Sequence, residues 1–121
     1  MQFDFSGSTP IFRQVAQQLS ESIAAGQIDE GERVPSTTEI STVYKVNPAT
    51  VLKGMNLLVD QGLLEKRRGL GMFVATGARK RAQRVQARLL LDEELPALAR
   101  QARLLGISLD ELSKALERSY R

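Results

Sequence analysis

The chain has 121 residues, a formal net charge of +3 and a sequence pI near 9.6. Its 42% hydrophobic and 26% charged residues are typical of a folded globular protein. No apolar run reaches the roughly 18 residues of a membrane span, so none is expected. The sequence contains neither Cys nor His, which are the usual nucleophile, general base and soft metal ligands. Its other polar residues show no catalytic arrangement, so we expect neither an enzyme nor a cofactor.

The location and the charge distribution follow from the same composition. The first ten residues lack the basic and apolar regions of a signal peptide, and without Cys the cytoplasm is the expected location. Residues 1–75 hold seven basic and eight acidic residues, whereas residues 76–121 hold ten basic and six acidic residues. A basic protein is suited to binding nucleic acid, but a net charge of +3 is weak support by itself.

A first helix is predicted from Thr9 to Ala25, with Thr9 as the N-cap and Pro10 in the first helical position. Gly26 would end it in a left-handed conformation. One apolar face repeats at spacings of three and four residues: Phe12, Val15, Leu19 and Ile23. Arg33 and Val34 are expected to form a very short strand.

Two shorter helices are predicted next. The second begins after Ser36, which has capping-box spacing to Glu39, and runs to about Tyr44. Its inward residues are expected to be Ile40, Val43 and Tyr44. The third is capped by Asn47 and ends at Gly62. Its buried stripe is expected to be Val51, Met55, Leu58 and Val59.

Short helices joined by a tight turn indicate a helix-turn-helix, although an unrelated helical hairpin gives the same spacing. The next stretch favours the first interpretation, because residues 63–67 and 72–74 resemble two strands joined by a turn. This order predicts a mainly α fold with a small β-hairpin wing, a winged helix-turn-helix in residues 1–76. Lys66, Arg67 and Arg68 lie consecutively at the hairpin tip, where they either face an anion or are merely solvated.

Residues 77–121 are predicted to form a short two-helix C-terminal tail. Leucines repeat there at heptad-like spacing, and Pro96 within the repeat is expected to kink or break the helix. Ser108 and Glu111 form a second capping box. Two helices of this size cannot enclose a core, so we expect the tail to bind a second copy, with packing on the first domain as the alternative. The predicted dimer interface comprises Leu91, Leu95, Leu98, Ala102, Leu105, Leu109, Leu112 and Leu116.

Several blocks resemble the GntR family of bacterial regulators in the family's order. They are Pro10-Ile11-Phe12-Arg13-Gln14-Val15, Gly31 to Ser36, Val46 to Val51, Gln61 to Leu64 and Arg67 to Val74. The Asn-Pro-x-Thr start of the third helix and the short tail resemble the YtrA-like branch. Members of that branch look like homodimers joined through a two-helix tail, without a large ligand-binding domain.

The resemblance implies that the third helix lies in the major groove, with its first residues nearest the bases. It also implies phosphate contacts at the second helix and at the wing, whose glycines allow close approach to DNA. The predicted DNA-binding residues are Ser36, Thr38, Asn47, Pro48, Thr50, Lys53, Lys66, Arg67, Arg68, Gly69 and Gly71.

Three positions depart from the family pattern. The family often has Arg where this chain has Thr38, Pro48 and Leu52, so the usual base contacts are in doubt and a different operator is suggested. The basic residues Arg79, Lys80, Arg81 and Arg84 would replace part of the lost phosphate attraction, or form a solvated helix face.

The expected function is therefore that of a homodimeric, sequence-specific transcription regulator. It is expected to act as a repressor that binds double-stranded operator DNA. A protein-interaction module and a nonspecific architectural protein are the alternatives. The polar third helix and basic wing favour DNA over the first, and the modest charge of residues 1–75 argues against the second. Control by a small-molecule effector is left open, because the sequence shows no ligand pocket. Asp92, Glu93 and Glu94 are expected to form a solvated turn and not a metal site.

Overall fold

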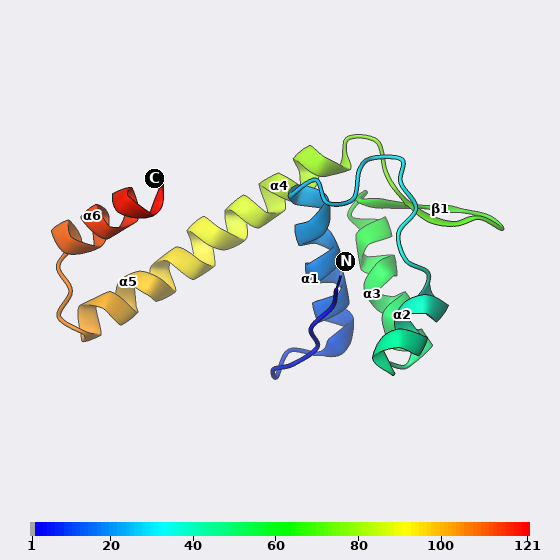
Figure 1. The fold of residues 1–121 in the computed structure, drawn as a ribbon, viewed down its shortest axis with the longest axis horizontal. Coiled ribbons are helices and arrows are strands. Elements are labelled where there is room, and N and C mark those ends of the chain that lie inside the picture. The colour runs from blue at the N-terminus through cyan, green and yellow to red at the C-terminus, as the bar shows by residue number, and fades with distance from the viewer. Residues whose placement is uncertain (1) are drawn as a thin grey trace. The chain divides into compact units, whose positions relative to one another are not determined.

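The computed structural model describes residues 2–121 (Figure 1). The chain forms two compact units, Met1–Gln86 and Ala87–Arg121. The elements in chain order are α1 (Ile11–Ala24), α2 (Thr37–Tyr44), α3 (Pro48–Asp60), β1 (Leu64–Arg67), β2 (Gly71–Val74), α4 (Ala78–Leu89), the π-helical turn η1 (Leu90–Glu94), α5 (Leu95–Leu104) and α6 (Leu109–Ser119). The predicted mainly α fold with a small hairpin wing is confirmed.

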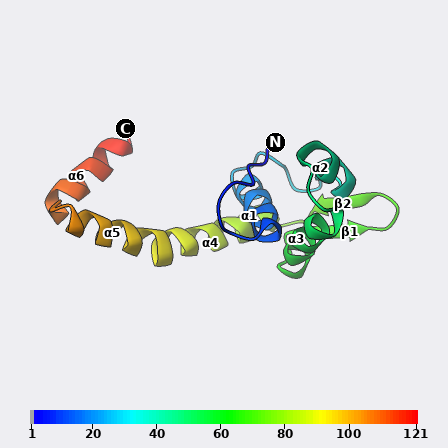
Figure 2. The ribbon, with the colours of Figure 1, turned by 90° about the horizontal axis from the view of Figure 1, so that it is seen from below.

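The core of the first unit lies between three helices and the base of the hairpin. Helices α1 and α3 pack against each other, α2 packs on α3, and the antiparallel hairpin extends away from them (Figures 1 and 2). The predicted short strand appears as a single bridge between Arg33 and Phe73, which adds the loop before α2 to the hairpin. The fully buried side chains of this core are Val15, Leu19, Ile23, Ile40, Val51, Met55, Leu58, Leu63 and Val74.

Two local predictions were wrong. Thr9 is not the N-cap of α1: Pro10 occupies that position in extended backbone, and the Thr9 carbonyl accepts a hydrogen bond from Gln14 Nε2 at 2.6 Å. Val43 does not face inward and is 70% exposed. The N-terminal segment covers the Tyr44 side of α2, where the Phe3 N–H donates to Tyr44 Oη at 2.9 Å. Val43 lies on the other side of the buried Ile40 and lacks such cover.

The first turns of α4 are part of the first unit's core. Ala78 and Ala82 have no exposed surface. The Glu30 carboxylate accepts hydrogen bonds from the Gly77 N–H at 2.7 Å and the Arg79 N–H at 3.2 Å, and so caps the start of the helix from the loop after α1. A carboxylate is favoured there because the first N–H groups of a helix have no intrahelical acceptor.

Glu30 gives the fold a dependence on pH. The Gly77 and Arg79 N–H groups hold the pKa of the Glu30 carboxyl below its usual value. The stabilisation is therefore present above the unfolded pKa of about 4.3 and lost as pH falls through the lower folded pKa. We expect urea unfolding of the native chain to lose stability below about pH 4.3 more steeply than Glu30→Gln does. Asp60→Asn serves as the control, and parallel pH curves for the native chain and Glu30→Gln would contradict the assignment.

Arg81 anchors α4 to the end of α3 and is not a free cation. Its Nη2 donates to the Gly62 carbonyl at 2.6 Å and to the Thr76 carbonyl at 2.8 Å. Arg81 is therefore not part of a merely solvated helix face, since its guanidinium is bound to backbone acceptors. Arg79, Lys80 and Arg84 remain exposed.

Removal of this anchor should destabilise the first unit. We expect Arg81→Ala to lower the free energy of unfolding by about 1.5–3 kcal/mol, because charge-assisted hydrogen bonds to two carbonyls are lost. Urea denaturation measures the change. The exposed Arg84→Ala, which removes the same group from the same helix, should change it by no more than about 0.5 kcal/mol. Equal effects of the two variants would show that Arg81 is only a surface residue.

In the second unit, Pro96 produces a π-helical turn and no break in helical structure. Proline has no N–H to donate to the carbonyl four residues earlier, and its ring crowds that carbonyl. The backbone inserts η1 immediately before it, and the Leu95 N–H donates to the Leu90 carbonyl five residues earlier. Such wide turns relieve this kind of conflict in a helix. The predicted capping box of α6 is confirmed, with Ser108 Oγ accepting from the Glu111 N–H at 3.1 Å.

Candidate nucleic-acid interface

Helix α3 buries one face in the core and leaves the opposite face open. Asn47 Oδ1 accepts the Ala49 N–H at 2.8 Å, and Pro48 takes the first turn, as the sequence predicts. Val51, Gly54, Met55 and Leu58 are buried against the rest of the unit. Asn47, Pro48 and Lys53 are exposed and Thr50 is half-buried. The start of α3 therefore presents a surface that can enter a DNA groove.

A groove of about 440 Å³ lies between the start of α2 and the wing hairpin. Met55 and Met72 contribute to its lining. The predicted residues that line it are Ser36, Thr38, Lys66, Arg67, Arg68, Gly69 and Gly71. Segments about thirty positions apart in sequence thus present their polar groups on one surface. The remaining predicted residues, Asn47, Pro48, Thr50 and Lys53, lie at the start of α3 outside this groove.

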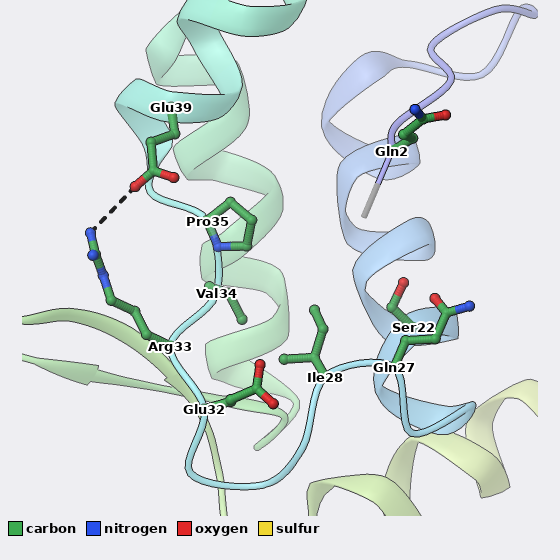
Figure 3. A pocket seen from close by; sticks show the side chains of 9 residues that line it. All are labelled: Gln2, Ser22, Gln27, Ile28, Glu32, Arg33, Val34, Pro35 and Glu39. Carbon is green, nitrogen blue, oxygen red and sulfur yellow. Dashed lines mark ion pairs between the residues drawn. The ribbon is translucent and has the colours of Figure 1, made fainter.

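Ser36 caps α2 with its side chain, while the predicted capping box is only half formed. Ser36 Oγ accepts the Glu39 N–H at 3.0 Å. The Glu39 carboxylate instead turns toward Arg33, whose Nη2 lies 3.5 Å away (Figure 3). Both side chains are more than half exposed, so this ion pair contributes little to stability. The Ser36 hydroxyl still has a proton to donate to an anion at the helix start.

The wing cations differ in how they are held. Arg67 Nη2 lies 2.7 Å from Glu65 Oε1, and its guanidinium stacks 4.2 Å from the centre of the Phe73 ring. Lys66 and Arg68 are exposed. Gly71 has a φ of 112°, and a Cβ there would lie 3.1 Å from Arg33 Nε. The tight wing turn therefore requires glycine at this position.

A second basic cluster joins α3 to the start of α1. Lys53 Nζ lies 4.1 Å from the centre of the Phe12 ring, and Arg13 Cζ lies 5.2 Å from the same centre. Both cations are exposed. Sequence reasoning did not single out Arg13, because only the packing of α1 on α3 brings Lys53 to the Phe12 ring beside it. No spacing signal links the two positions.

A polar hollow of about 810 Å³ lies beside the loop between α1 and α2 (Figure 3). Ser22, Gln27 and Glu32 are among the polar residues that line it, with the Arg33–Glu39 pair. Ligand pockets are mostly apolar with a few convergent polar groups, which this hollow does not resemble. Among residues 2–121, no group of three or more His, Cys, Asp or Glu side chains is arranged to hold a metal ion.

The tail leaves most of its predicted interface residues uncovered within the second unit. Ala102 is 5% exposed and Leu112 is half-buried. The exposed leucines of the predicted interface are Leu91 (58%), Leu95 (44%), Leu98 (47%), Leu105 (70%), Leu109 (80%) and Leu116 (56%). No helix among residues 2–121 is both long and apolar enough to cross a bilayer.

Comparisons with known proteins agree with this arrangement. Residues 12–74 match the family described as "Bacterial regulatory proteins, gntR family". The HTH-type transcriptional repressor YtrA of Bacillus subtilis (strain 168) is 32% identical over 113 residues, which are 93% of this chain and 85% of that protein. A solved structure assigned to the GntR family from Bacteroides thetaiotaomicron is 32% identical, with a TM-score of 0.71 over 90% of this chain and 96% of that one.

A further solved structure contains DNA. The AraR DNA-binding domain in complex with operator ORX1 is 31% identical, with a TM-score of 0.57 over 62% of this chain and 96% of that one. The family match covers α1 to β2, the part of the fold that carries the groove and the start of α3. The chain belongs to the gntR family of bacterial regulatory proteins and is a DNA-binding transcription regulator.

Proposed function

We propose that the chain is a homodimeric repressor that reads a two-fold symmetric operator with α3 and holds the DNA backbone with α2 and the wing. The observation that carries this proposal is the groove that Ser36 and Thr38 line together with the wing cations, on a unit whose α3 also begins with exposed residues. In a helix-turn-helix, the first helix crosses the DNA backbone and the second, the recognition helix, lies in the major groove.

Each contact residue then has a role that follows from its chemistry. Ser36 and Thr38 bind a phosphate at the start of α2, where free N–H groups and the helix dipole favour an anion. Asn47 and Pro48 set the position of the first turn of α3, and Thr50 and Lys53 contact base edges or phosphates. In the wing, Lys66, Arg67 and Arg68 bind phosphates or the minor groove, while Gly69 and Gly71 let the backbone approach.

The dimer is proposed to form through the apolar interface residues between Leu91 and Leu116, which lie in η1, in α5 and its C-cap, and in α6. A unit of this size cannot bury such side chains within itself, and exposed apolar surface of this kind is typical of a protein interface. A second copy has the same leucines and can cover them symmetrically. Two linked DNA-binding units would then read half-sites about 34 Å apart or a multiple of that distance.

Repression is proposed because the similar YtrA protein is named as a transcriptional repressor. A dimer bound over a promoter excludes RNA polymerase by occupying its site. Repression by binding to DNA takes place in the cytoplasm, where the bacterial chromosome lies. It involves no catalytic step. A small-molecule effector would act by changing the spacing of the two α3 helices in the dimer.

The direct test is a fluorescence-anisotropy titration of the full chain against its own upstream promoter and against scrambled DNA. We expect selective promoter binding that weakens steeply between about 50 and 200 mM salt, because bound phosphates release counterions. The variant Thr50→Ala with Lys53→Ala should lose at least about tenfold of the promoter affinity.

The matched control is Thr76→Ala with Lys114→Ala, which removes the same groups outside α3 and the wing. It should bind the promoter like the native chain. Equal binding of the native chain to both DNAs, unchanged in the α3 variant, would overturn the proposal for this promoter. The same binding comparison on a panel of genomic fragments tests the proposal at other sites.

A further inference from the structure

At the start of α3, the protein itself uses one polar side chain as a cap, and a second lies against α1. Asn47 Oδ1 accepts the Ala49 N–H at 2.8 Å, which uses it as the helix cap. Lys53 Nζ lies 4.1 Å from the Phe12 ring centre, a contact that favours its lying toward α1. Thr50 is half-buried. The side chains that remain in the first two turns of the open face are small or apolar.

Ala49 and Leu52 form this apolar surface. They are three residues apart on a helix and so lie next to each other on one face. Leu52 is 38% exposed although it belongs to a helix whose other large apolar residues pack inward. Ala49, Leu52 and Lys53 line one shallow hollow of about 340 Å³ with Asn56, Leu57 and Asp60. The hollow lies on the face that the proposed function directs into the major groove.

Base chemistry then decides what this surface can read. The thymine C5-methyl is the one apolar group on the major-groove edges of the base pairs, and Ala and other apolar side chains contact it. Guanine is most often read by Arg or Lys in a two-point hydrogen bond. Helix α3, Pro48–Asp60, contains no Arg, and its single Lys is the one beside Phe12.

We propose that each operator half-site is read by Ala49 and Leu52 through thymine methyl groups, so that A·T pairs and not guanine lie opposite the first two turns of α3. The inference rests on the proposed function, since it requires α3 to enter the major groove. Leu52 is thereby a specificity-determining residue, and its loss should change which base is preferred and not only how tightly DNA binds.

The first experiment selects DNA from a random library with the full native chain. The proposal predicts a two-fold symmetric motif with A·T pairs opposite the start of α3. In the selected operator, each thymine of a half-site is then replaced singly by deoxyuridine, which removes only the methyl group. At one or two positions per half-site we expect about threefold to fivefold weaker binding by the native chain, the effect of one buried methyl group. Deoxyuridine in the spacer should have no effect.

Protein variants identify the partner of that methyl. With Leu52→Ala, the same deoxyuridine replacements should no longer weaken binding, because the apolar contact is already gone. Leu52→Met keeps an apolar side chain and should keep the sensitivity. Leu52→Arg, used in a new selection, should enrich guanine at that position. Thermal unfolding of each variant checks the fold, and the deoxyuridine series on the native chain does not depend on any variant.

The outcomes separate the two proposals. A selected motif with conserved guanine opposite α3, or equal deoxyuridine losses for the native chain and Leu52→Ala, overturns thymine reading and leaves the regulator proposal standing. If the native chain enriches no motif at all, both proposals fail together.

Discussion

Leu98→Asp is expected to convert the chain from dimer to monomer and to weaken operator binding by at least about 100-fold. Leu98 is 47% exposed on α5, in the middle of the proposed seam. A carboxylate there would have to be buried without a partner when two tails pack, which is costly. Each DNA-binding unit would then bind its half-site alone. It would lose the gain in affinity that results when the two units of a dimer bind the same DNA. Light scattering measures the mass, and anisotropy on the selected operator measures the affinity.

Leu104→Asp is the matched control. Leu104 lies on the same helix and is 88% exposed, but it is outside the heptad-like seam. The control should remain dimeric and bind like the native chain. If Leu98→Asp remains dimeric with unchanged affinity, the tail leucines are not the interface, and the alternative of packing against the first domain regains support.

Gly54→Val is expected to destabilise the first unit by at least about 3 kcal/mol, a large part of a small domain's total stability. Gly54 lies in the middle of α3 where the helix meets α1. A Cβ at this position would lie 2.5 Å from the Phe12 carbonyl oxygen and 3.0 Å from Val15 Cβ. Because the obstacle is backbone, α1 and α3 would have to separate, and the Lys53–Phe12 contact would be disturbed with them.

Gly54→Ala separates this contact from helix propensity. Alanine in place of glycine gains about 1 kcal/mol within a helix, whereas the overpacked Cβ costs about 1–3 kcal/mol. We expect a net loss of stability in urea denaturation. Asn56→Ala, on the open face of the same helix, should stay within about 0.5 kcal/mol of the native chain. A Gly54→Ala variant more stable than the native chain would show that the close helix contact has no energetic weight.

The start or end of a helix was predictable where the chemistry of one or two residues determines the local backbone conformation. Asn47 and Pro48 mark the start of α3, Ser108 with Glu111 marks the start of α6, and Gly62 ends α3 with a φ of 76°. The wing was predictable because the glycine-containing turn Arg68 to Gly71 separates a segment that begins with two leucines from the apolar segment Met72 to Val74. The start of α1 was not, because Thr9 and Pro10 can each occupy the cap position and only the extended backbone of Pro10 decides between them.

What the sequence could not predict depends on contacts between distant segments. Arg81 looks like one more cation in a basic helix, and only its distances to the Gly62 and Thr76 carbonyls reveal an anchor. Glu30 looks like part of a polar turn until α4 folds back to it. The cluster of Arg13 and Lys53 around Phe12 likewise depends on how α1 crosses α3. The sequence predicted the candidate site residues. It could not predict the groove that the α2 and wing residues line together.

The central claim is that two copies of α3 read one operator, and hydroxyl-radical footprinting of the full chain on the selected DNA tests it most directly. We expect two protected segments on one face of the duplex, related by a dyad and centred about 34 Å or a multiple of it apart. Leu98→Asp should remove both segments at the same concentration. A single protected segment, or uniform protection along any DNA, would contradict the claim that the chain reads an operator as a dimer.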